Sequence, residues 1–277
     1  MKSLSSTVEL NNGVHMPWVG LGVFQSEPGT VTYDAVRSAL DTGYRHIDTA
    51  TFYRNEADVG KALAEHPVPR EEVFVTTKVW NDQKGYDATL RAFDYSMEQL
   101  GLDVLDLYLI HWPIKDSFLD RWQALERLYK DGRIRAIGVS NFFSHHLQQL
   151  MDQAEVVPAV NQVEFHPRLI QKPLLEFCRS NGIQLEAWSP LMRGGLFDNP
   201  VVAKVASEVH RTQAQVLIRW GLQHSVVTIP KSVNPERIKA NAQVFDFELN
   251  DEQMKALDSL DDGHRIGPNP DELGGWK

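Results

Sequence analysis

The chain has 277 residues, of which 42% are hydrophobic and 23% charged, so it can bury a large globular core. Its 28 basic and 37 acidic residues give a net charge of −9, which disfavours nonspecific binding to nucleic acids or anionic membranes. No apolar run approaches the roughly 20 residues that span a bilayer, and the first residues lead into no signal-peptide core. Cys178 is the only cysteine, which excludes an internal disulfide and a thiolate metal site. We therefore expect a cytoplasmic protein with one domain over residues 1–277 and no nucleic-acid or membrane partner.

The chain opens with a predicted β-hairpin and then alternates strands with helices. The hairpin covers residues 8–17 around an Asn11-Asn12-Gly13 turn. Short β-branched and apolar runs predict strands at residues 20–24, 44–48, 73–78, 104–110, 134–139, 159–163, 183–188 and 226–229. Helical periodicity predicts helices at residues 30–42, 55–65, 86–100, 119–130, 144–153, 172–180, 200–210, 213–223, 235–242 and 251–260. A Gly/Pro-rich tail follows at residues 263–277.

This alternation predicts the fold class. Strands that alternate with helices imply a parallel sheet with right-handed crossovers. Eight short apolar units favour closure into a (β/α)8 TIM barrel over an open doubly wound sheet. An open dinucleotide-binding sheet would also need a Gly-rich loop after its first strand, and Gly20-Leu21-Gly22 lacks the third glycine at the required spacing. We predict a barrel with an N-terminal hairpin and two extra helices.

Ionisable side chains stand at the predicted carboxyl ends of the strands, where barrel enzymes have their active sites. Asp48 ends the second strand, with Tyr53 on the following loop, and Lys78 and His111 end the next two strands. A strand-end lysine is costly to bury without a partner, and Asp48 is a natural one. An ammonium beside Tyr53 would lower the pKa of the phenol toward the working pH. With His111 orienting a carbonyl oxygen, the four residues predict proton delivery to a substrate carbonyl. Taken singly, each also fits a structural role, such as a packed tyrosine or a snorkelling lysine.

The histidines show no metal signature. None of the ten forms a His-x-x-x-His pair with carboxylate support. His145 and His146 are adjacent on a predicted helix and are expected to point to different faces. His46 lies inside a predicted strand and is expected to pack in the core. We therefore predict no metal site.

A second cluster follows the eighth predicted strand. Lys231, Ser232 and Arg237 supply two cations and a hydroxyl near the start of a helix, where barrels often bind phosphate. The alternative is a helix cap with solvated charges. An arginine able to stack on a base and hold a ribose phosphate would favour NADP over NAD.

Several motifs occur in a fixed order along the chain, mostly at these strand ends. They are Gly43-Tyr44-Arg45-His46-Ile47-Asp48-Thr49-Ala50, Tyr53-Arg54-Asn55-Glu56, Lys78-Val79-Trp80, Asp106-Leu107-Tyr108-Leu109-Ile110-His111-Trp112-Pro113, Gly138-Val139-Ser140-Asn141-Phe142, Asn161-Gln162-Val163-Glu164, Trp188-Ser189-Pro190-Leu191 and Ile229-Pro230-Lys231-Ser232. In this order they resemble the signatures of the aldo-keto reductase family over essentially the whole chain. The bacterial branch with glyoxal, methylglyoxal and 2,5-diketo-gluconate reductases is the most similar.

The resemblance implies an NADP-dependent oxidoreductase that binds NADPH in extended form, without a Rossmann domain, and reduces a small-molecule carbonyl substrate. It implies Tyr53 as proton donor, Asp48 and Lys78 as the groups that tune it, and His111 as the carbonyl-orienting group. Ser140, Asn141 and Gln162 would hold the carboxamide, and Trp188 would stack under the nicotinamide. The remaining cofactor contacts implied by the resemblance are Ser189 and Leu191 at the pyrophosphate, and Lys231, Ser232, Val233, Arg237 and Asn241 at the 2′-phosphate and adenine.

The resemblance also implies the substrate pocket, formed by Phe24, Trp80, His111, Trp112 and the tail near Trp276. Many animal members carry tryptophan at the position of Phe24, and the tail is short. Small aldehydes, dicarbonyls such as methylglyoxal and glyoxal, aromatic aldehydes and keto-sugars therefore fit better than bulky steroids. The habit of the family implies a monomer.

Two other functions remain open at this point. A strand-end lysine in a barrel also suits a Schiff-base aldolase that uses Lys78. The acid–base neighbours of Lys78 and the basic cluster argue against it. A regulatory protein that senses NADPH without turnover would share the cofactor site.

Overall fold

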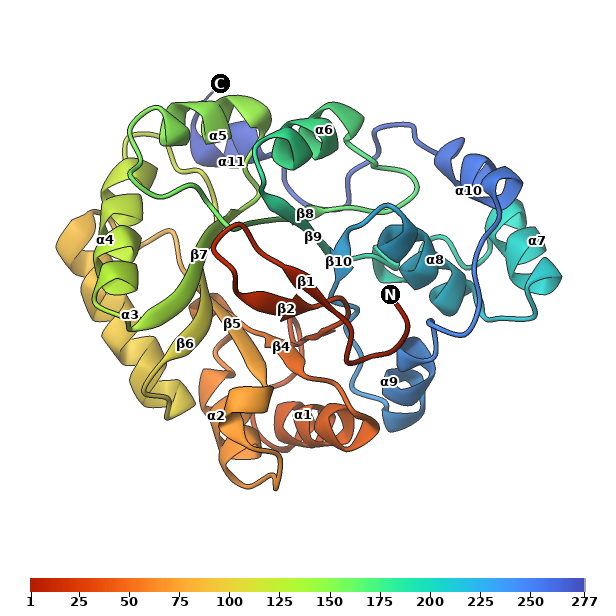
Figure 1. The fold of residues 1–277 in the computed structure, drawn as a ribbon, viewed down its shortest axis with the longest axis horizontal. Coiled ribbons are helices and arrows are strands. Elements are labelled where there is room, and N and C mark those ends of the chain that lie inside the picture. Colours follow the sequence, from red (N-terminus) through yellow and green to blue (C-terminus); the bar gives the residue numbers. More distant parts are fainter. Residues whose placement is uncertain (277) are drawn as a thin grey trace.

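Eight parallel strands close into a barrel in the computed structural model, which describes residues 1–276 (Figure 1). They are β3 (Leu21–Gly22), β4 (His46–Asp48), β5 (Phe74–Val79), β6 (Leu105–Ile110), β7 (Ile134–Ser140), β8 (Val160–Glu164), β9 (Gln184–Trp188) and β10 (Val227–Thr228). Each strand pairs in parallel with the next along the chain. Parallel bridges join Val19 to Thr228 and Gly22 to Lys231, so the first and last strands meet. The prediction of a (β/α)8 barrel is confirmed.

The predicted hairpin is also present. Strands β1 (Thr7–Glu9) and β2 (His15–Pro17) pair antiparallel, and Figure 1 shows them in dark red in front of the barrel. Leu10 and Met16 are buried in one cluster with Phe74 at the start of β5. Since the hairpin covers the amino ends of the strands, the opposite end is the one left for a site.

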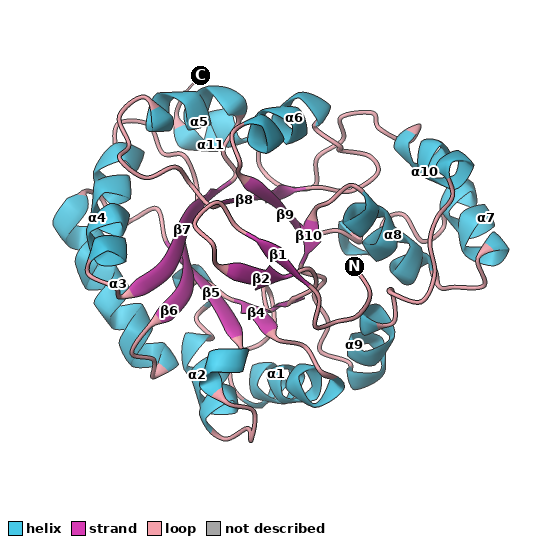
Figure 2. Ribbon diagram, in the orientation of Figure 1, coloured by secondary structure: helices cyan, strands magenta, loops and turns pink. Residues whose placement is uncertain are grey.

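The helices form an outer ring around the strands (Figure 2). They are α1 (Thr30–Thr42), α2 (Glu56–Ala64), α3 (Tyr86–Leu100), α4 (Phe118–Lys130), α5 (Ser144–Met151), α6 (Lys172–Ser180), α7 (Pro200–Glu208), α8 (Gln213–Gln223), α9 (Pro235–Ala242), α10 (Asp251–Asp258) and α11 (Pro270–Gly274). Helices α7 and α10 are the two predicted extra ones, whereas the short α11 lies in the segment predicted as an irregular tail. No helix within residues 1–276 combines the length and the apolar character needed to cross a membrane.

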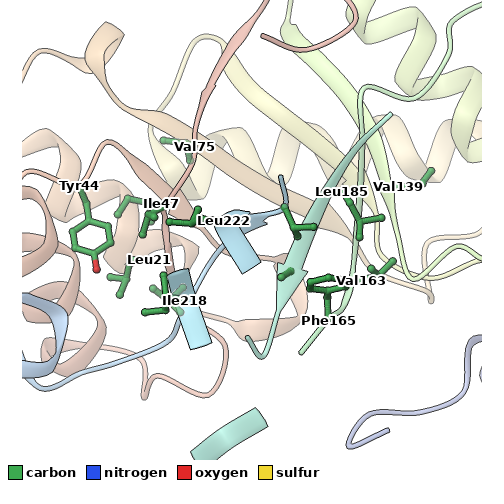
Figure 3. Close-up of a cluster of buried hydrophobic side chains, with 14 of the residues drawn as sticks. Leu21, Tyr44, Ile47, Val75, Val139, Val163, Phe165, Leu185, Ile218 and Leu222 are labelled. Carbon is green, nitrogen blue, oxygen red and sulfur yellow. The ribbon is translucent and has the colours of Figure 1, made fainter. Parts of the chain in front are cut away.

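Alternation along the strands separates two environments. Outward-facing side chains such as Ile47, Val75 and Leu185 belong to one buried apolar cluster with Ile218 and Leu222 of α8 (Figure 3). Neighbouring positions on the same strands point into the barrel, because successive side chains of a strand face opposite sides. The inward positions become polar toward the carboxyl ends, and the candidate site begins there.

Candidate active site

The four predicted catalytic residues meet at the carboxyl end of the barrel. Asp48 ends β4, Lys78 lies on β5, and Tyr53 ends a short 3-10 helix (Thr51–Tyr53) that follows β4. The Lys78 Nζ donates to both carboxylate oxygens of Asp48, at 2.7 and 2.8 Å, and lies 3.4 Å from the Tyr53 hydroxyl. Lys78 is 0% exposed and Asp48 2%, so the pair is sealed from water. The predicted partnership of these three residues is present in the structure.

Aromatic rings lie next to Tyr53 and His111. The ring centroids of Tyr53 and His111 are 5.8 Å apart, and Trp80 lies edge-on to His111 at 5.0 Å. Phe24 is 5.0 Å from the Tyr53 ring and 37% exposed, while Trp112 is buried beside His111 in the sequence. The structure thus brings Phe24 and Trp80, two of the predicted substrate residues, next to the phenol and the imidazole.

The charge state of Lys78 follows from its partners. Burial lowers the pKa of the amine, but the charge of Asp48 and the hydrogen bonds to it help to outweigh burial, and the pKa is raised above its usual value. Burial raises the pKa of Asp48, opposed by Lys78 and by a hydrogen bond from Gln162. Because Lys78 donates to both oxygens of Asp48, we interpret the pair as an ammonium and a carboxylate. An ammonium has no lone pair for a carbonyl carbon, which argues against a Schiff-base aldolase.

The acidity of Tyr53 differs from the prediction. Lys78 lowers the pKa of the phenol as expected, but burial outweighs it and raises the pKa to about 12. Tyr53 is therefore protonated at neutral pH, which is the form that can donate a proton. Burial and the Lys78 charge lower the pKa of His111 well below its usual value, so its imidazole is neutral.

The three residues predicted to hold a carboxamide are neighbours. The Ser140 hydroxyl donates to the Gln162 carbonyl at 2.8 Å. The Asn141 amide donates to the His111 carbonyl at 3.0 Å, and its oxygen accepts from Trp188 Nε1 at 2.8 Å. Asn141 adopts a left-handed φ of 66°, which turns the chain sharply after β7. It thus connects the catalytic cluster to Trp188, the predicted nicotinamide platform.

The predicted phosphate and adenine residues lie on the loop after β10 and on α9. Lys231, Val233 and Arg237 are exposed, whereas Ser232 and Asn241 are buried. The Asn234 side chain caps α9 by accepting from the Arg237 backbone N–H at 3.0 Å. Exposed cations beside a helix amino terminus suit a phosphate group. Ser189 and Leu191 are partly exposed on the loop after β9, between these two regions in the chain. The residues present therefore fit an extended dinucleotide phosphate.

Comparison with known proteins identifies the family. Residues 20–262 match the family model described as Aldo/keto reductase family. The chain belongs to the aldo-keto reductases. It is 58% identical over 271 residues to glyoxal reductase of Bacillus subtilis (strain 168), covering 98% of both chains. It is 45% identical over 272 residues to methylglyoxal reductase DkgA of Salmonella typhimurium, covering 97% of this chain and 98% of that one. A variant of Gox0644 solved in complex with NADPH superposes with a TM-score of 0.92 at 44% identity, covering 98% of both chains.

Ile266 and Gly267 of the C-terminal segment form a strap, and its Gly267 lies against Trp188. The Glu164 carboxylate on β8 accepts backbone N–H bonds from Ile266 at 2.7 Å and Gly267 at 3.0 Å. A Cβ added at Gly267 would lie 2.4 Å from Cη2 of Trp188, so the strap passes directly against the indole. Sequence reasoning missed this support, because the strap is about 100 residues from Glu164 along the chain.

A second contact of the tail corrects the prediction for His145 and His146. Their ring centroids are 4.0 Å apart, and the Nε2 atoms of both lie 3.0 Å from Oδ1 of Asp271. The expectation that they point to different faces is wrong, because Asp271 lies between two adjacent first-turn positions and both long side chains reach it. The His146 Nδ1 accepts from the Phe143 backbone N–H at 3.0 Å, which leaves the hydrogen on Nε2. His145 Nε2 is hydrogen-bonded to Asp271, whereas the equally near His146 Nε2 makes no hydrogen bond within residues 1–276. We therefore interpret the cluster as two imidazoles packed around a carboxylate that fastens the tail to α5.

The end of the tail reaches the loop after His111. The Trp276 indole donates to the Pro113 carbonyl at 2.6 Å, and the Lys115 N–H donates to the Gly274 carbonyl at 2.9 Å. The tail therefore lies against the loop that follows His111, and its role in the substrate pocket stays a prediction.

Two ionisable residues of the barrel interior were not predicted as part of the site. Glu186 on β9 is 0% exposed, and its Oε2 accepts from the Gln162 amide at 2.8 Å. His46, predicted only to pack, is also fully buried, and its Nε2 lies 3.6 Å from Oε1 of Glu186. A signal was present in the sequence: Glu186 stands two positions before Trp188, and residues two apart on a strand share a face.

Proposed function

We propose that this reductase converts small aldehydes and ketones to alcohols, with NADPH as the hydride source and Tyr53 as the proton donor. The observation that carries the proposal is the 3.4 Å separation between the Tyr53 hydroxyl and the Lys78 ammonium beside a neutral His111. The names of two relatives, glyoxal reductase and methylglyoxal reductase, support small dicarbonyls as substrates. Aromatic aldehydes and keto-sugars belong to the same proposed range.

The chain's own residues provide the proton chemistry. The neutral imidazole of His111 donates a hydrogen bond to the substrate carbonyl oxygen and orients it. The Tyr53 phenol then gives its proton to the oxygen as negative charge develops there. The Lys78 ammonium stabilises the phenolate that remains, and Asp48 keeps Lys78 charged. The aromatic side chains around the phenol limit the space to small carbonyl compounds.

The proposed cofactor residues follow the order of the strand ends. NADPH, when bound, supplies the hydride. We assign the carboxamide to Ser140, Asn141 and Gln162. Both amide hydrogens of Gln162 are engaged by the carboxyl groups of Asp48 and Glu186, so its amide nitrogen has no further hydrogen to donate. The remaining proposed contacts are Trp188, Ser189, Leu191, Lys231, Ser232, Val233, Arg237 and Asn241. The solved complex of a Gox0644 variant with NADPH supports NADPH as the cofactor.

Replacing Tyr53 tests the proton donor. In Tyr53→Phe we expect NADPH binding to persist while turnover falls by about 10²–10⁴-fold, because the developing alkoxide loses its acid. The measurement is NADPH oxidation against methylglyoxal, glyoxal, aromatic aldehydes and keto-sugars, with NADPH binding followed separately. Tyr95→Phe, at a tyrosine of α3 that is 53% exposed, is the matched control. Near-normal turnover in Tyr53→Phe contradicts the assignment. Tight NADPH binding by the native chain without turnover on any carbonyl would favour an NADPH sensor.

We further propose that the reductase works as a cytoplasmic monomer. The net charge of −9 and the single, buried cysteine support this proposal. Sedimentation at the mass of one 31.5 kDa chain is the expected result, and a stable dimer contradicts it.

A further inference from the structure

A second carboxyl group lies inside the barrel next to the catalytic pair. The Gln162 Nε2 donates to Oδ2 of Asp48 at 2.7 Å and to Oε2 of Glu186 at 2.8 Å. Strands β4, β8 and β9 do not all neighbour one another, so these contacts cross the barrel interior. One amide therefore holds Glu186 next to the residue that keeps Lys78 charged.

The interior holds too few positive charges for two carboxylates. The charged neighbours of Glu186 in the described part of the chain are Asp48 and Lys78. Lys78 donates to both oxygens of Asp48, to the Thr49 carbonyl at 2.8 Å and to the Tyr53 hydroxyl at 3.4 Å, and none of its recorded hydrogen bonds goes to Glu186 within residues 1–276. Burial and then Lys78 lower the pKa of His46 to about 3, so it is neutral. An ionised Glu186 would be an uncompensated buried charge, which is costly.

The proton of this group has a defined place. Burial, and then the charge of Asp48, raise the pKa of Glu186 to about 8. Its Oε2 accepts from Gln162, whereas its Oε1 has no hydrogen-bond partner among residues 1–276 and lies 3.6 Å from His46 Nε2. A shift of a few tenths of an ångström would bring Oε1 into hydrogen-bond range of that nitrogen. Thr76 Oγ1 lies 3.2 Å from the same nitrogen. Oε1 is thus the oxygen that carries the hydrogen.

We propose that Glu186 is a positioning residue that must stay a neutral carboxylic acid during turnover, and that its ionisation suppresses proton donation by Tyr53. This rests on the proposed function, since it names a residue that acts through Tyr53. The Glu186 carboxyl loses its proton to solvent as pH rises, and no substrate bond changes in that step. The added negative charge repels the Tyr53 phenolate that proton donation produces. In accord with this, the charge of Glu186 raises the pKa of Tyr53.

The pH profile of Glu186→Gln tests the proposal. Glutamine imitates the neutral acid, with an oxygen toward Gln162 and an N–H toward His46. Near about pH 6–7 we expect kcat with an aromatic aldehyde and NADPH within about twofold of the native enzyme. Near about pH 9.5 we expect the variant to exceed the native enzyme by about tenfold, since a nearby like charge changes the acidity of a buried group by about that factor. A variant that keeps the native high-pH decline overturns the proposal, as does one that loses activity at neutral pH while remaining folded.

Two controls separate charge from structure. Glu176→Gln changes an exposed glutamate of α6 and should leave the pH profile unchanged. Glu186→Leu removes both the acceptor for Gln162 and the titrating carboxyl, so it should lower activity at every pH and, like Glu186→Gln, lack the native high-pH decline.

An infrared titration of the native protein gives a readout that needs neither a variant nor turnover. We expect a protonated-carboxyl band that is present near about pH 6 and disappears with a midpoint near about pH 8. Its absence near neutral pH overturns the proposal even if Glu186→Gln fails to fold. Absence of carbonyl reduction by the native enzyme, with this band present, would instead contradict the proposed function and leave the neutral acid in place.

Discussion

Replacing Lys78 tests whether water is excluded from the buried ion pair of Lys78 and Asp48, as the structure indicates. Lys78→Met keeps most of the side-chain length but leaves Asp48, which is 2% exposed, as a carboxylate whose remaining side-chain donor is Gln162 at 2.7 Å. Breaking a buried pair from one side costs about 3–5 kcal/mol of folding free energy, because the other charge stays buried and unpaired. Lys130→Met removes one partner of an exposed pair with Glu155 and should leave stability unchanged.

The loss of folding free energy in Lys78→Met should depend on pH in a defined direction. Without Lys78 the pKa of Asp48 in the folded state rises further above its unfolded value of about 3.9, so the folded variant binds a proton more tightly than the unfolded chain. The loss of folding free energy is therefore largest at pH values above the folded-state pKa of Asp48. It becomes smaller as the pH falls toward about 4, by up to about 1.4 kcal/mol per pH unit. Asp48→Asn in the same chain should remove this slope and recover about 2 kcal/mol or more.

Urea unfolding followed by tryptophan fluorescence measures both quantities, and the chain has seven tryptophans as reporters. Lys78→Met, Asp48→Asn, the double variant and Lys130→Met should be unfolded at several pH values between about 5 and 8. A loss below about 1 kcal/mol, or a loss that is the same at every pH, would refute the reasoning. Either result would mean that water or another donor compensates Asp48 after Lys78 is removed.

Two further predictions concern the cofactor. Gly267→Ala would place a Cβ 2.4 Å from Cη2 of Trp188 and 3.1 Å from the Glu164 carboxylate, and we expect it to displace the indole and weaken NADPH binding by about tenfold or more. Quenching of tryptophan fluorescence by NADPH measures this, and unchanged affinity would show that Trp188 does not set the platform. Arg237→Ala should weaken NADPH much more than NADH in paired binding titrations, because only NADPH carries the 2′-phosphate. Equal weakening of both would argue against a phosphate contact.

Helix boundaries could be predicted where a capping residue ends the helix. Helices α1 and α3 have their predicted bounds, and both end at a glycine with a left-handed φ, 104° at Gly43 and 64° at Gly101. The short α11 was missed, because its Gly/Pro-rich composition is typical of an irregular tail. It nevertheless has start signals, with Pro270 in the first turn and the Asn269 side chain accepting from the Asp271 N–H.

The position of the catalytic residues was also predictable, because parallel strands bring their carboxyl ends to one edge. That rule alone was enough to predict that Asp48, Lys78 and Tyr53 lie close together. The acidity of Tyr53 was not predictable in the same way. A sequence shows that a cation is near, but the desolvation that raises the pKa of the phenol depends on how completely the surrounding rings exclude water.

Glu164 and Glu186 show why the charge states of side chains inside the barrel could not be predicted from the sequence. Both are inward-facing glutamates on neighbouring strands, and burial raises the pKa of each. Glu164 also accepts from His166 Nε2 at 2.9 Å and from the N–H groups of Ile266 and Gly267, and these bonds lower its pKa below the usual value. Glu186 accepts a single hydrogen bond, from Gln162, and keeps its proton. The number of donors decides which is the carboxylate, and two of those donors come from a tail whose path only the folded chain reveals.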